Sequence, residues 1–250
     1  MSQLSNSVTN QPHSPTHTTG MGASTRNHYQ HELSNLQDTL LDMASMVDKV
    51  IYLAVYALKT HNFREAQHVI DSDQLINSRR YQLEEEALTL LATQQPVLSH
   101  DLRMTAAVMH MAGELERMGD YAKGIARINA RLTYEVPTNI IVVFEEMAAK
   151  CRLMLNQALD AFIKHDAASA AKIISNDDEV DVLYNQAYHD LLRMMMDDSK
   201  FIDEATMLLW AAHNLERLGD RVTNICQRII FVETGQLENL HGSGSLPASQ

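Results

Sequence analysis

The sequence is poor in residues that interrupt helices and in residues that cross-link small folds. Its 250 residues include 9 glycines, 5 prolines and 2 cysteines. Scarce glycine and proline favour long helices, because both residues weaken or break them. Cys151 and Cys226 are isolated in apolar segments, which excludes a disulfide framework and a cysteine zinc site. We therefore expect two buried thiols.

Long apolar runs and excess basic charge are also missing. The segment IIVVF at 140–144 is far shorter than the roughly 18–20 apolar residues of a membrane-spanning helix. The first residues lack the charged and apolar regions of a signal peptide. The net charge of −12 argues against a nucleic-acid partner, which needs a basic surface. We predict a cytoplasmic protein with no membrane insertion, which can still dock on a membrane complex.

Apolar residues recur at steps of three and four along most of the chain. This spacing places them on one face of a helix. Pro96 ends one such segment, and Pro137 is suited to the start of another. The predicted helices cover about 33–58, 63–93, 98–133, 140–161, 166–196 and 201–236.

The second half of the chain repeats the first with a period near 100 residues. Aligning 111–126 with 211–226 gives seven identical pairs among 16. The break THNFREA at 60–66 also matches KHDAAS at 164–169. Three long helices written twice predict an all-α fold of two tandem, pseudo-symmetric antiparallel three-helix bundles, with six long helices in total.

This repeat divides the chain into four segments. The first bundle is expected at 25–134 and the second at 135–236. Residues 1–24 are rich in Ser, Thr, Asn, Gln, His and Pro without an apolar period, which predicts a disordered tail. Residues 237–250 are predicted to form a flexible C-terminal tail.

The repeated motif Leu-Glu-Arg-x-Gly-Asp carries the main chemical signal. Residues four apart share a helix face, so Glu116 lies beside Asp120 and Glu216 beside Asp220. Such like-charge pairs cost roughly 0.2–0.5 kcal/mol on an exposed helix. The motif's helical glycine, such as Gly119, costs about 1 kcal/mol relative to alanine. A bound cation would offset both costs, and the repetition of the motif favours this interpretation.

Further acids lie on the helix that precedes each motif. The segment 71–77 resembles 175–181, which aligns Asp73 with Asp177. Oxygen-only ligands favour hard cations such as Mg²⁺, Mn²⁺, Ca²⁺ or iron. The candidate ligands on these helices are Asp71, Asp73, Glu84, Glu85 and Glu86 in the first half, and Asp177, Asp178, Asp181 and Asp190 in the second.

Two other interpretations of the motif remain open. The acids can form a solvated face, with Arg117 and Arg217 pairing to the aspartates three residues on. Alternatively, the protein is a helical-bundle metalloenzyme that uses the duplicated carboxylate sites. A di-iron carboxylate oxidase should show two Glu-x-x-His units, but the chain shows one, at 65–68. Phosphate-binding loops, nucleophile motifs and zinc patterns are not found.

These features resemble the PhoU family of accessory regulators of bacterial phosphate-specific transport systems. The likeness covers nearly all of 28–236 and rests on the two motif copies, the duplicated helix plan and LLATQQPVLSHDLR at 90–103. It implies multinuclear metal binding by the ExxxD motifs, with iron or zinc in some members, and the oxygen ligands of this chain add manganese or magnesium as candidates. The implied ligands are Glu116, Asp120, Glu216 and Asp220, with Asp73, Glu85, Asp177, Asp181 and Asn224 as further candidates.

The resemblance also implies a function. Family members are non-enzymatic and repress phosphate-starvation signalling when phosphate is plentiful. The implied partners are the ATPase subunit of the phosphate ABC transporter and a sensor histidine kinase, and the implied assembly is a homodimer. The protein would then associate peripherally with an inner-membrane transporter complex.

The chain departs from the family pattern at Gly124, Glu114 and Asn214, whereas Asn224 keeps it. The family often has Asn four residues after the motif aspartate, where this chain has Gly124 and Asn224. It often has Asp two residues before the glutamate, where this chain has Glu114 and Asn214. We therefore expect the first-half site to be the less complete of the two.

Overall fold

The computed structural model describes residues 19–93 and 97–236, and within them every regular element is a helix. This confirms the predicted all-α fold. The helices are α1 (Thr19–Thr60), α2 (Phe63–Thr93), α3 (Ser99–Asn129), α4 (Thr138–Ile163), α5 (Ala167–Ile174), α6 (Asp177–Asp197) and α7 (Ile202–Thr234), with the short 3₁₀ helix η1 (Ser199–Phe201) before α7. None of these helices is long and apolar enough to cross a bilayer.

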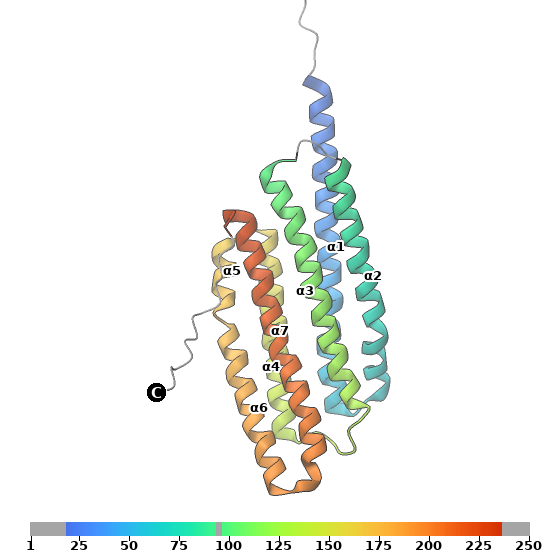
Figure 1. Cartoon of the computed structure of the whole chain (residues 1–250), viewed down its shortest axis with the longest axis vertical. Coiled ribbons are helices and arrows are strands. Elements are labelled where there is room, and N and C mark those ends of the chain that lie inside the picture. The colour runs from blue at the N-terminus through green and yellow to red at the C-terminus, as the bar shows by residue number, and fades with distance from the viewer. Residues whose placement is uncertain (1–18, 94–96, 237–250) are drawn as a thin grey trace, which may run out of the picture.

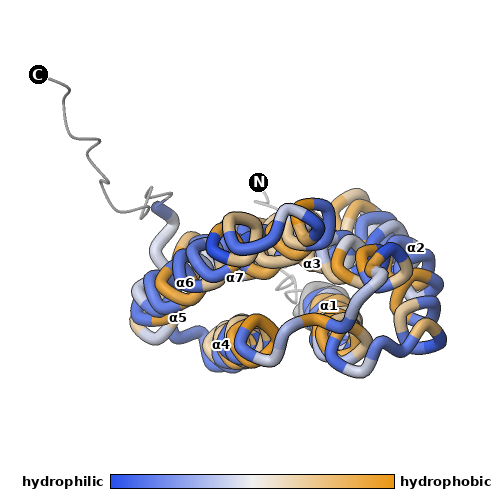
Figure 2. The backbone as a smooth tube through the Cα atoms, turned by 90° about the horizontal axis from the view of Figure 1, so that it is seen from below, coloured by the Kyte–Doolittle hydropathy of each residue, from blue (hydrophilic) through white to orange (hydrophobic). Residues whose placement is uncertain are grey.

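The helices run alternately up and down, except that α6 continues in the direction of α5 (Figure 1). Viewed from below, α1 and α4 lie in one row and α3 and α7 in the other (Figure 2). Helix α2 packs on α1 and α3, while α5 and α6 pack on α4 and α7. The molecule is therefore two three-sided bundles joined along two helix pairs, α1 with α4 and α3 with α7.

The start of α1 differs from the prediction. The predicted tail at 1–24 overlaps the helix, which begins at Thr19. The prediction of disorder is thus wrong for residues 19–24, because a helix once nucleated extends through residues that lack an apolar period. The rest of that predicted tail, 1–18, and the predicted C-terminal tail at 237–250 lie outside the described residues.

The predicted single helix over 166–196 is also wrong, because the chain turns at Ser175 and Asn176 between α5 and α6. The amides of both residues donate to carbonyls three residues back, which closes α5 with a tight turn. Asp177, Asp178 and Glu179 then form the first turn of α6, where acidic side chains interact favourably with the helix dipole. Asp177 is consequently the first residue of a helix, whereas its aligned residue Asp73 lies inside the uninterrupted α2.

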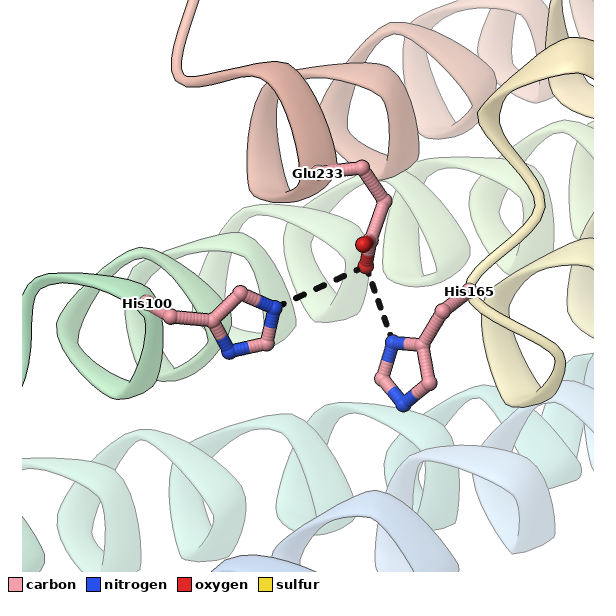
Figure 3. Close-up of side chains that lie close together, drawn as sticks. All are labelled: His100, His165 and Glu233. Carbon is pink, nitrogen blue, oxygen red and sulfur yellow. Dashed lines mark hydrogen bonds and ion pairs between the residues drawn. The ribbon is translucent and has the colours of Figure 1, made fainter.

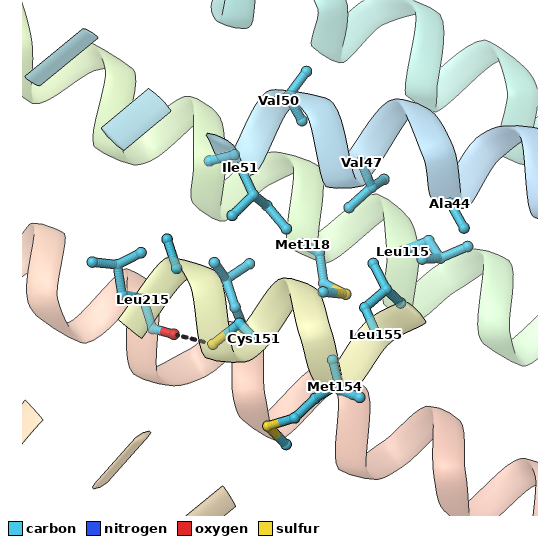
Figure 4. Packing of buried hydrophobic residues seen from close by; sticks show 14 of the residues in the cluster. Ala44, Val47, Val50, Ile51, Leu115, Met118, Cys151, Met154, Leu155 and Leu215 are labelled. Carbon is cyan, nitrogen blue, oxygen red and sulfur yellow. Dashed lines mark hydrogen bonds between the residues drawn. The ribbon is translucent and has the colours of Figure 1, made fainter. Parts of the chain in front are cut away.

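One apolar core runs through both bundles. Figure 4 shows side chains of α1, α3, α4 and α7 that pack together where the bundles meet, among them Ile51, Met118 and Leu155. Cys151 and Cys226 are fully buried, which confirms the expected thiols. Burial raises the pKa of Cys226 to about 12 and that of Cys151 further. Both sulfurs are therefore protonated core atoms.

The first turn of each bundle is built in the same way. His61 and His165 have left-handed φ values of 49° and 54°, a conformation that costs about 1–2 kcal/mol for a residue with a side chain. In each case the next residue caps the following helix: Asn62 accepts from the Glu65 amide, and Asp166 from the Ser169 amide. The internal repeat thus extends to the backbone of the turns.

Candidate functional site

The first acidic cluster lies between α2 and α3 and contains Asp73, Glu116 and Asp120. Two cations lie within it. The Lys123 ammonium is 2.6 Å from Asp73 Oδ2 and 3.3 Å from Asp120 Oδ1. Arg80 Nη1 lies 3.4 Å from Glu116 Oε2. The carboxylates of this cluster are therefore neutralised largely by the protein's own side chains.

Within this cluster, the Glu116 carboxyl group has a raised pKa. Burial raises its pKa, and the charge of Asp120 raises it further, while Arg80 acts in the opposite direction. Partial burial and the like charge of Asp120 one turn away thus both oppose the ionisation of Glu116.

The second acidic cluster lies between α6 and α7 and contains Asp177, Asp181, Glu216 and Asp220. Burial raises the pKa of Asp177 to about 7, with the charges of Asp220 and Asp181 as the next causes. The pKa of Glu216 and that of Asp181 are also raised, in both cases first by burial and then by Asp220. Three of the four carboxyl groups thus bind protons more tightly than they would in water.

A histidine and an arginine lie at the edge of the second cluster. His213 Nδ1 lies 3.3 Å from Glu216 Oε2, and Arg221 Nη2 lies 3.7 Å from Asp220 Oδ2. Among the described residues, no lysine pairs with any of the four carboxylates. Glu216 Oε2 is buried and, among the described residues, accepts no hydrogen bond, since the His213 contact is only an ion pair. A buried carboxylate oxygen without a donor is a suitable ligand for a cation.

The motif glycines make different contacts in the two clusters. A Cβ on Gly219 would overlap Asp177 Oδ1, so the absence of a side chain lets this carboxylate approach α7. A Cβ on Gly119 would instead lie 3.1 Å from the methyl carbon Cδ1 of Ile76. Gly219 therefore leaves space for a candidate ligand in the second cluster, whereas Gly119 leaves space for apolar packing in the first.

Two substitutions between the repeats account for the different cations. Three residues after the motif aspartate, α3 has Lys123 and α7 has Thr223, whose hydroxyl donates to the Asp220 carbonyl 2.8 Å away. Seven residues after the aligned aspartate, α2 has Arg80 and α6 has Tyr184. The donor set of the second cluster consequently fits a hard cation, whereas a metal in the first cluster would have to displace Lys123 Nζ.

Asn224, a further candidate ligand by resemblance, makes a contact with the other bundle. Its Nδ2 donates to Glu114 Oε2 at 3.0 Å, across the contact between α3 and α7. Arg117 and Arg221 also donate to Glu114, at 2.8 and 3.2 Å. In the pseudo-symmetric contact, Gly124 faces Asn214, whose Nδ2 would lie 2.8 Å from an added Cβ. Glu114, Asn214 and Gly124, which depart from the family pattern, and Asn224, which keeps it, thus lie at the contact between the two bundles.

The remaining candidate acids are dispersed. Glu85 is exposed, and Asp178 contributes only its charge to Asp177. The others accept hydrogen bonds within their own helix: Asp71 from Gln67, Glu84 from Arg80, Glu86 from Gln82 and Asp190 from Arg193.

A third cluster, His100, His165 and Glu233, was not predicted from the sequence (Figure 3). Its side chains come from the start of α3, the turn before α5 and the end of α7. Residues so far apart in the chain show no recognisable metal-ligand spacing. Their one sequence signal is the repeated histidine of the turns, and it does not point to His100 or Glu233.

Comparison with known proteins supports the repeat independently. A family model described as the PhoU domain matches residues 40–128 and 144–229. The first match runs from α1 to α3 and the second from α4 to α7, so each falls within one bundle.

Named relatives match over nearly the whole chain. The phosphate-specific transport system accessory protein PhoU homolog of Clostridium acetobutylicum is 33% identical over 217 residues, which is 87% of this chain and 99% of that protein. PhoU of Escherichia coli is 31% identical over 205 residues, 82% of this chain and 85% of that protein.

Solved structures share the same fold. The crystal structure of PhoU from Pseudomonas aeruginosa superposes with a TM-score of 0.78 at 32% identity, covering 83% of this chain and all of that one (100%). The phosphate transport system regulatory protein PhoU from Streptococcus pneumoniae gives 0.78 at 30% identity, covering 85% and 100%.

Proposed function

The chain belongs to the PhoU family, and from that premise we propose that it is an accessory protein of a phosphate-specific transport system. The observation that carries the proposal is the match of both bundles to the family domain, together with curated relatives that bear this name over almost their entire length.

In this proposal the protein is a regulator and not an enzyme. It represses phosphate-starvation signalling when phosphate is plentiful and modulates phosphate uptake. Its partners are the ATPase subunit of the phosphate ABC transporter and a sensor histidine kinase, and it acts as a homodimer at the cytoplasmic side of the membrane. The relative from Streptococcus pneumoniae is named a phosphate transport system regulatory protein, which supports the regulatory part of this assignment.

The proposal includes a metal ion in the second acidic cluster. Asp177, Glu216 and Asp220 would hold it, because Glu216 Oε2 lacks a hydrogen-bond donor and Gly219 lets Asp177 approach α7. Bound there, iron, zinc, manganese or magnesium would supply positive charge that offsets the carboxylate repulsion. The protein's own residues contribute orientation, since α6 and α7 hold their carboxylates on facing surfaces. Glu116, Asp120 and Asp73 remain candidate ligands of a second metal that competes with Lys123.

A deletion strain tests the regulatory role. Deleting the gene should raise expression of phosphate-regulated genes in phosphate-rich medium, and the wild-type gene on a plasmid should restore repression. Unchanged expression in the deletion strain would overturn the proposal. Recovery of the transporter ATPase and the kinase with the tagged protein from phosphate-replete cells would test the two partners.

Metal content and catalysis are measured on purified protein. Stoichiometric metal that falls on Asp177→Asn, with no turnover of phosphate esters, is the expected result. Metal-dependent turnover that is lost in Glu216→Ala would instead establish the metalloenzyme alternative.

A further inference from the structure

Two histidines and a glutamate, residue types that can ligate a metal, converge where the two bundles meet (Figure 3). His165 Nδ1 lies 2.9 Å from Glu233 Oε1, and His100 Nε2 lies 3.7 Å from the same oxygen. One ligand atom from each residue lies within 4.8 Å of the others. His100 belongs to the first bundle, whereas His165 and Glu233 belong to the second.

We propose that His100, His165 and Glu233 bind a divalent transition-metal ion of the Zn²⁺ type, which links the two bundles. Two imidazoles and one carboxylate are a known zinc ligand set, which leaves a fourth position for water or another ligand. Zinc bonds of 2.0–2.1 Å in tetrahedral geometry place ligand atoms about 3.3 Å apart. The distances of 2.9 and 3.7 Å to Glu233 Oε1 lie on either side of this value, and with all three ligand atoms within 4.8 Å of one another, side-chain rotations would bring them to this spacing.

Asp101 is a positioning residue for this site. Its Oδ1 lies 3.8 Å from His100 Nδ1, on the side of the ring away from Glu233. When His100 binds a metal through Nε2, its proton resides on Nδ1 and faces this carboxylate. A carboxylate behind a ligating histidine sets the tautomer and the ring orientation.

The opposite end of the molecule provides an internal comparison. His61 occupies the turn that corresponds to that of His165, with nearly the same φ. Its Nδ1 is buried without a hydrogen bond, and its ring packs against Phe63 with centroids 4.8 Å apart. With a repeat period of 100 residues, the position that corresponds to His100 is occupied by Lys200, and the one that corresponds to Glu233 is occupied by Thr133. The duplicated turn therefore places a histidine at both ends, but only one end adds the other two ligands.

This site is separate from the acidic clusters. Glu233 follows Asp220 by 13 residues on α7, which is about 20 Å along the helix axis. Its imidazole ligands also favour zinc, copper or nickel over the hard cations that carboxylates prefer. The two kinds of site can therefore be distinguished by position and by ligand chemistry.

The test uses the full chain after chelator treatment, with Zn²⁺ or Co²⁺ alone as the probe. His13 and His17 are replaced by Gln in every variant, so that these additional imidazoles do not contribute. The site variants are His100→Gln, Glu233→Gln and His165→Asn, since asparagine tolerates the left-handed backbone. The matched control is His68→Gln, an exposed histidine on α2.

We expect each site variant to bind one equivalent of Zn²⁺ less than the control, and to lose the visible absorption of cobalt bound by imidazole. Zn²⁺ should raise the Tm of the control and not that of His100→Gln. Asp101→Asn should weaken Zn²⁺ binding roughly 10–100-fold. Equal stoichiometry and equal Tm shifts in control and site variants would overturn the proposal.

Two further measurements test the proposal without relying on the folding of a site variant and separate it from the acidic-cluster proposal. Ring ¹⁵N chemical shifts of His100 and His165 in the unsubstituted full chain should move on addition of Zn²⁺, which needs no variant at these positions. If they do not move, the proposal fails even where a variant misfolds. Asp177→Asn should leave the shifts of both rings unchanged, so failure of the acidic-cluster proposal is distinguishable from failure of this one.

Discussion

The two bundles have the same arrangement of helices, but the carboxylates of their acidic clusters are paired with cationic side chains to different extents. In the first, Asp73 and Asp120 lie on either side of Lys123, and Glu116 lies beside Arg80. In the second, the cluster has Thr223 and Tyr184 at the corresponding positions, and its carboxyl groups hold their protons more tightly. The acids of the first motif copy are thus paired with lysine and arginine side chains of the protein, whereas the lack of a lysine partner in the second cluster, among the described residues, motivates the proposed metal ion there.

The break between α5 and α6 adds to this difference. It makes Asp177 the first residue of a helix, with its carboxylate against Gly219 of α7. Asp73 has no such position, because α2 is continuous through it. The second bundle therefore brings an acid closer to the motif helix than the first one does.

Removing the candidate ligands should have the largest effect and should separate the two halves. Asp177→Asn combined with Asp220→Asn should lower metal affinity by more than the roughly 10–100-fold typical of losing an outer-shell partner. Asp73→Asn combined with Asp120→Asn should change it much less, because Lys123 already compensates these carboxylates. Isothermal titration with elemental analysis measures both. Equal losses in the two double variants would contradict the comparison.

Exchanging Lys123 and Thr223 between the two bundles should exchange the metal-binding behaviour of the two acidic clusters. Lys123→Thr should destabilise the metal-free protein by about 1–3 kcal/mol, because Asp73 loses a charged partner, and should increase metal binding in the first half. Thr223→Lys should place an ammonium beside Asp220 and prevent metal binding in the second half. Urea unfolding and metal titration check both changes. Thr223→Met, similar in length and uncharged, is the control, and equal metal loss in it would mean that crowding and not charge is responsible.

The metal-free protein should become less stable as the pH rises. Asp177 keeps its proton up to about pH 7 when folded, but near pH 4 it ionises in the unfolded chain. The folded state therefore binds more protons between these values, and this group's contribution to stability is lost as the pH rises through about 7. Urea unfolding between pH 4 and pH 8 in the presence of chelator should show the decline in wild type. Asp177→Asn should weaken it and Asp73→Asn should not; an unchanged slope in Asp177→Asn would assign the dependence to other groups.

The smallest effects should come from the motif glycines. Gly119→Ala gains up to about 1 kcal/mol of helix propensity and needs only a small movement of the Ile76 methyl, so metal binding should be unchanged. Gly219→Ala has the same propensity gain but pushes the Asp177 carboxylate aside, which should lower metal affinity roughly tenfold, or about 1.4 kcal/mol. Thermal unfolding and metal titration measure the pair. Identical affinities in the two variants would show that the approach of Asp177 to α7 is unimportant.

Much of the fold was predictable because it depends on local patterns. The apolar stripes predicted most helix bounds to within a few residues, except the start of α1 and the break between α5 and α6, and the repeat aligned Asp73 with Asp177 by residue spacing alone. The turn at Ser175 and Asn176 was missed, because the apolar spacing continues across it and the residues are only moderately poor helix formers.

The candidate site was only partly predictable. Helical spacing placed Glu216 beside Asp220, since that neighbourhood needs nothing beyond one helix. The role of Lys123 was not predictable, although it stands three residues after Asp120, because its closest partner Asp73 comes from α2. The assignment of Asn224 as a ligand stays a prediction, and its observed partner is Glu114 of the other bundle.

The sequence by itself determined the helical class, the duplication and the pairs of carboxylates on each motif helix, because all three follow from residue spacing along one chain. Tertiary structure decided which carboxylates have a cation beside them, where Asn224 donates, and that His100, His165 and Glu233 meet. These outcomes depend on which faces of distant helices come into contact. No local pattern encodes that choice, because it is made by burial of the apolar core that both bundles share.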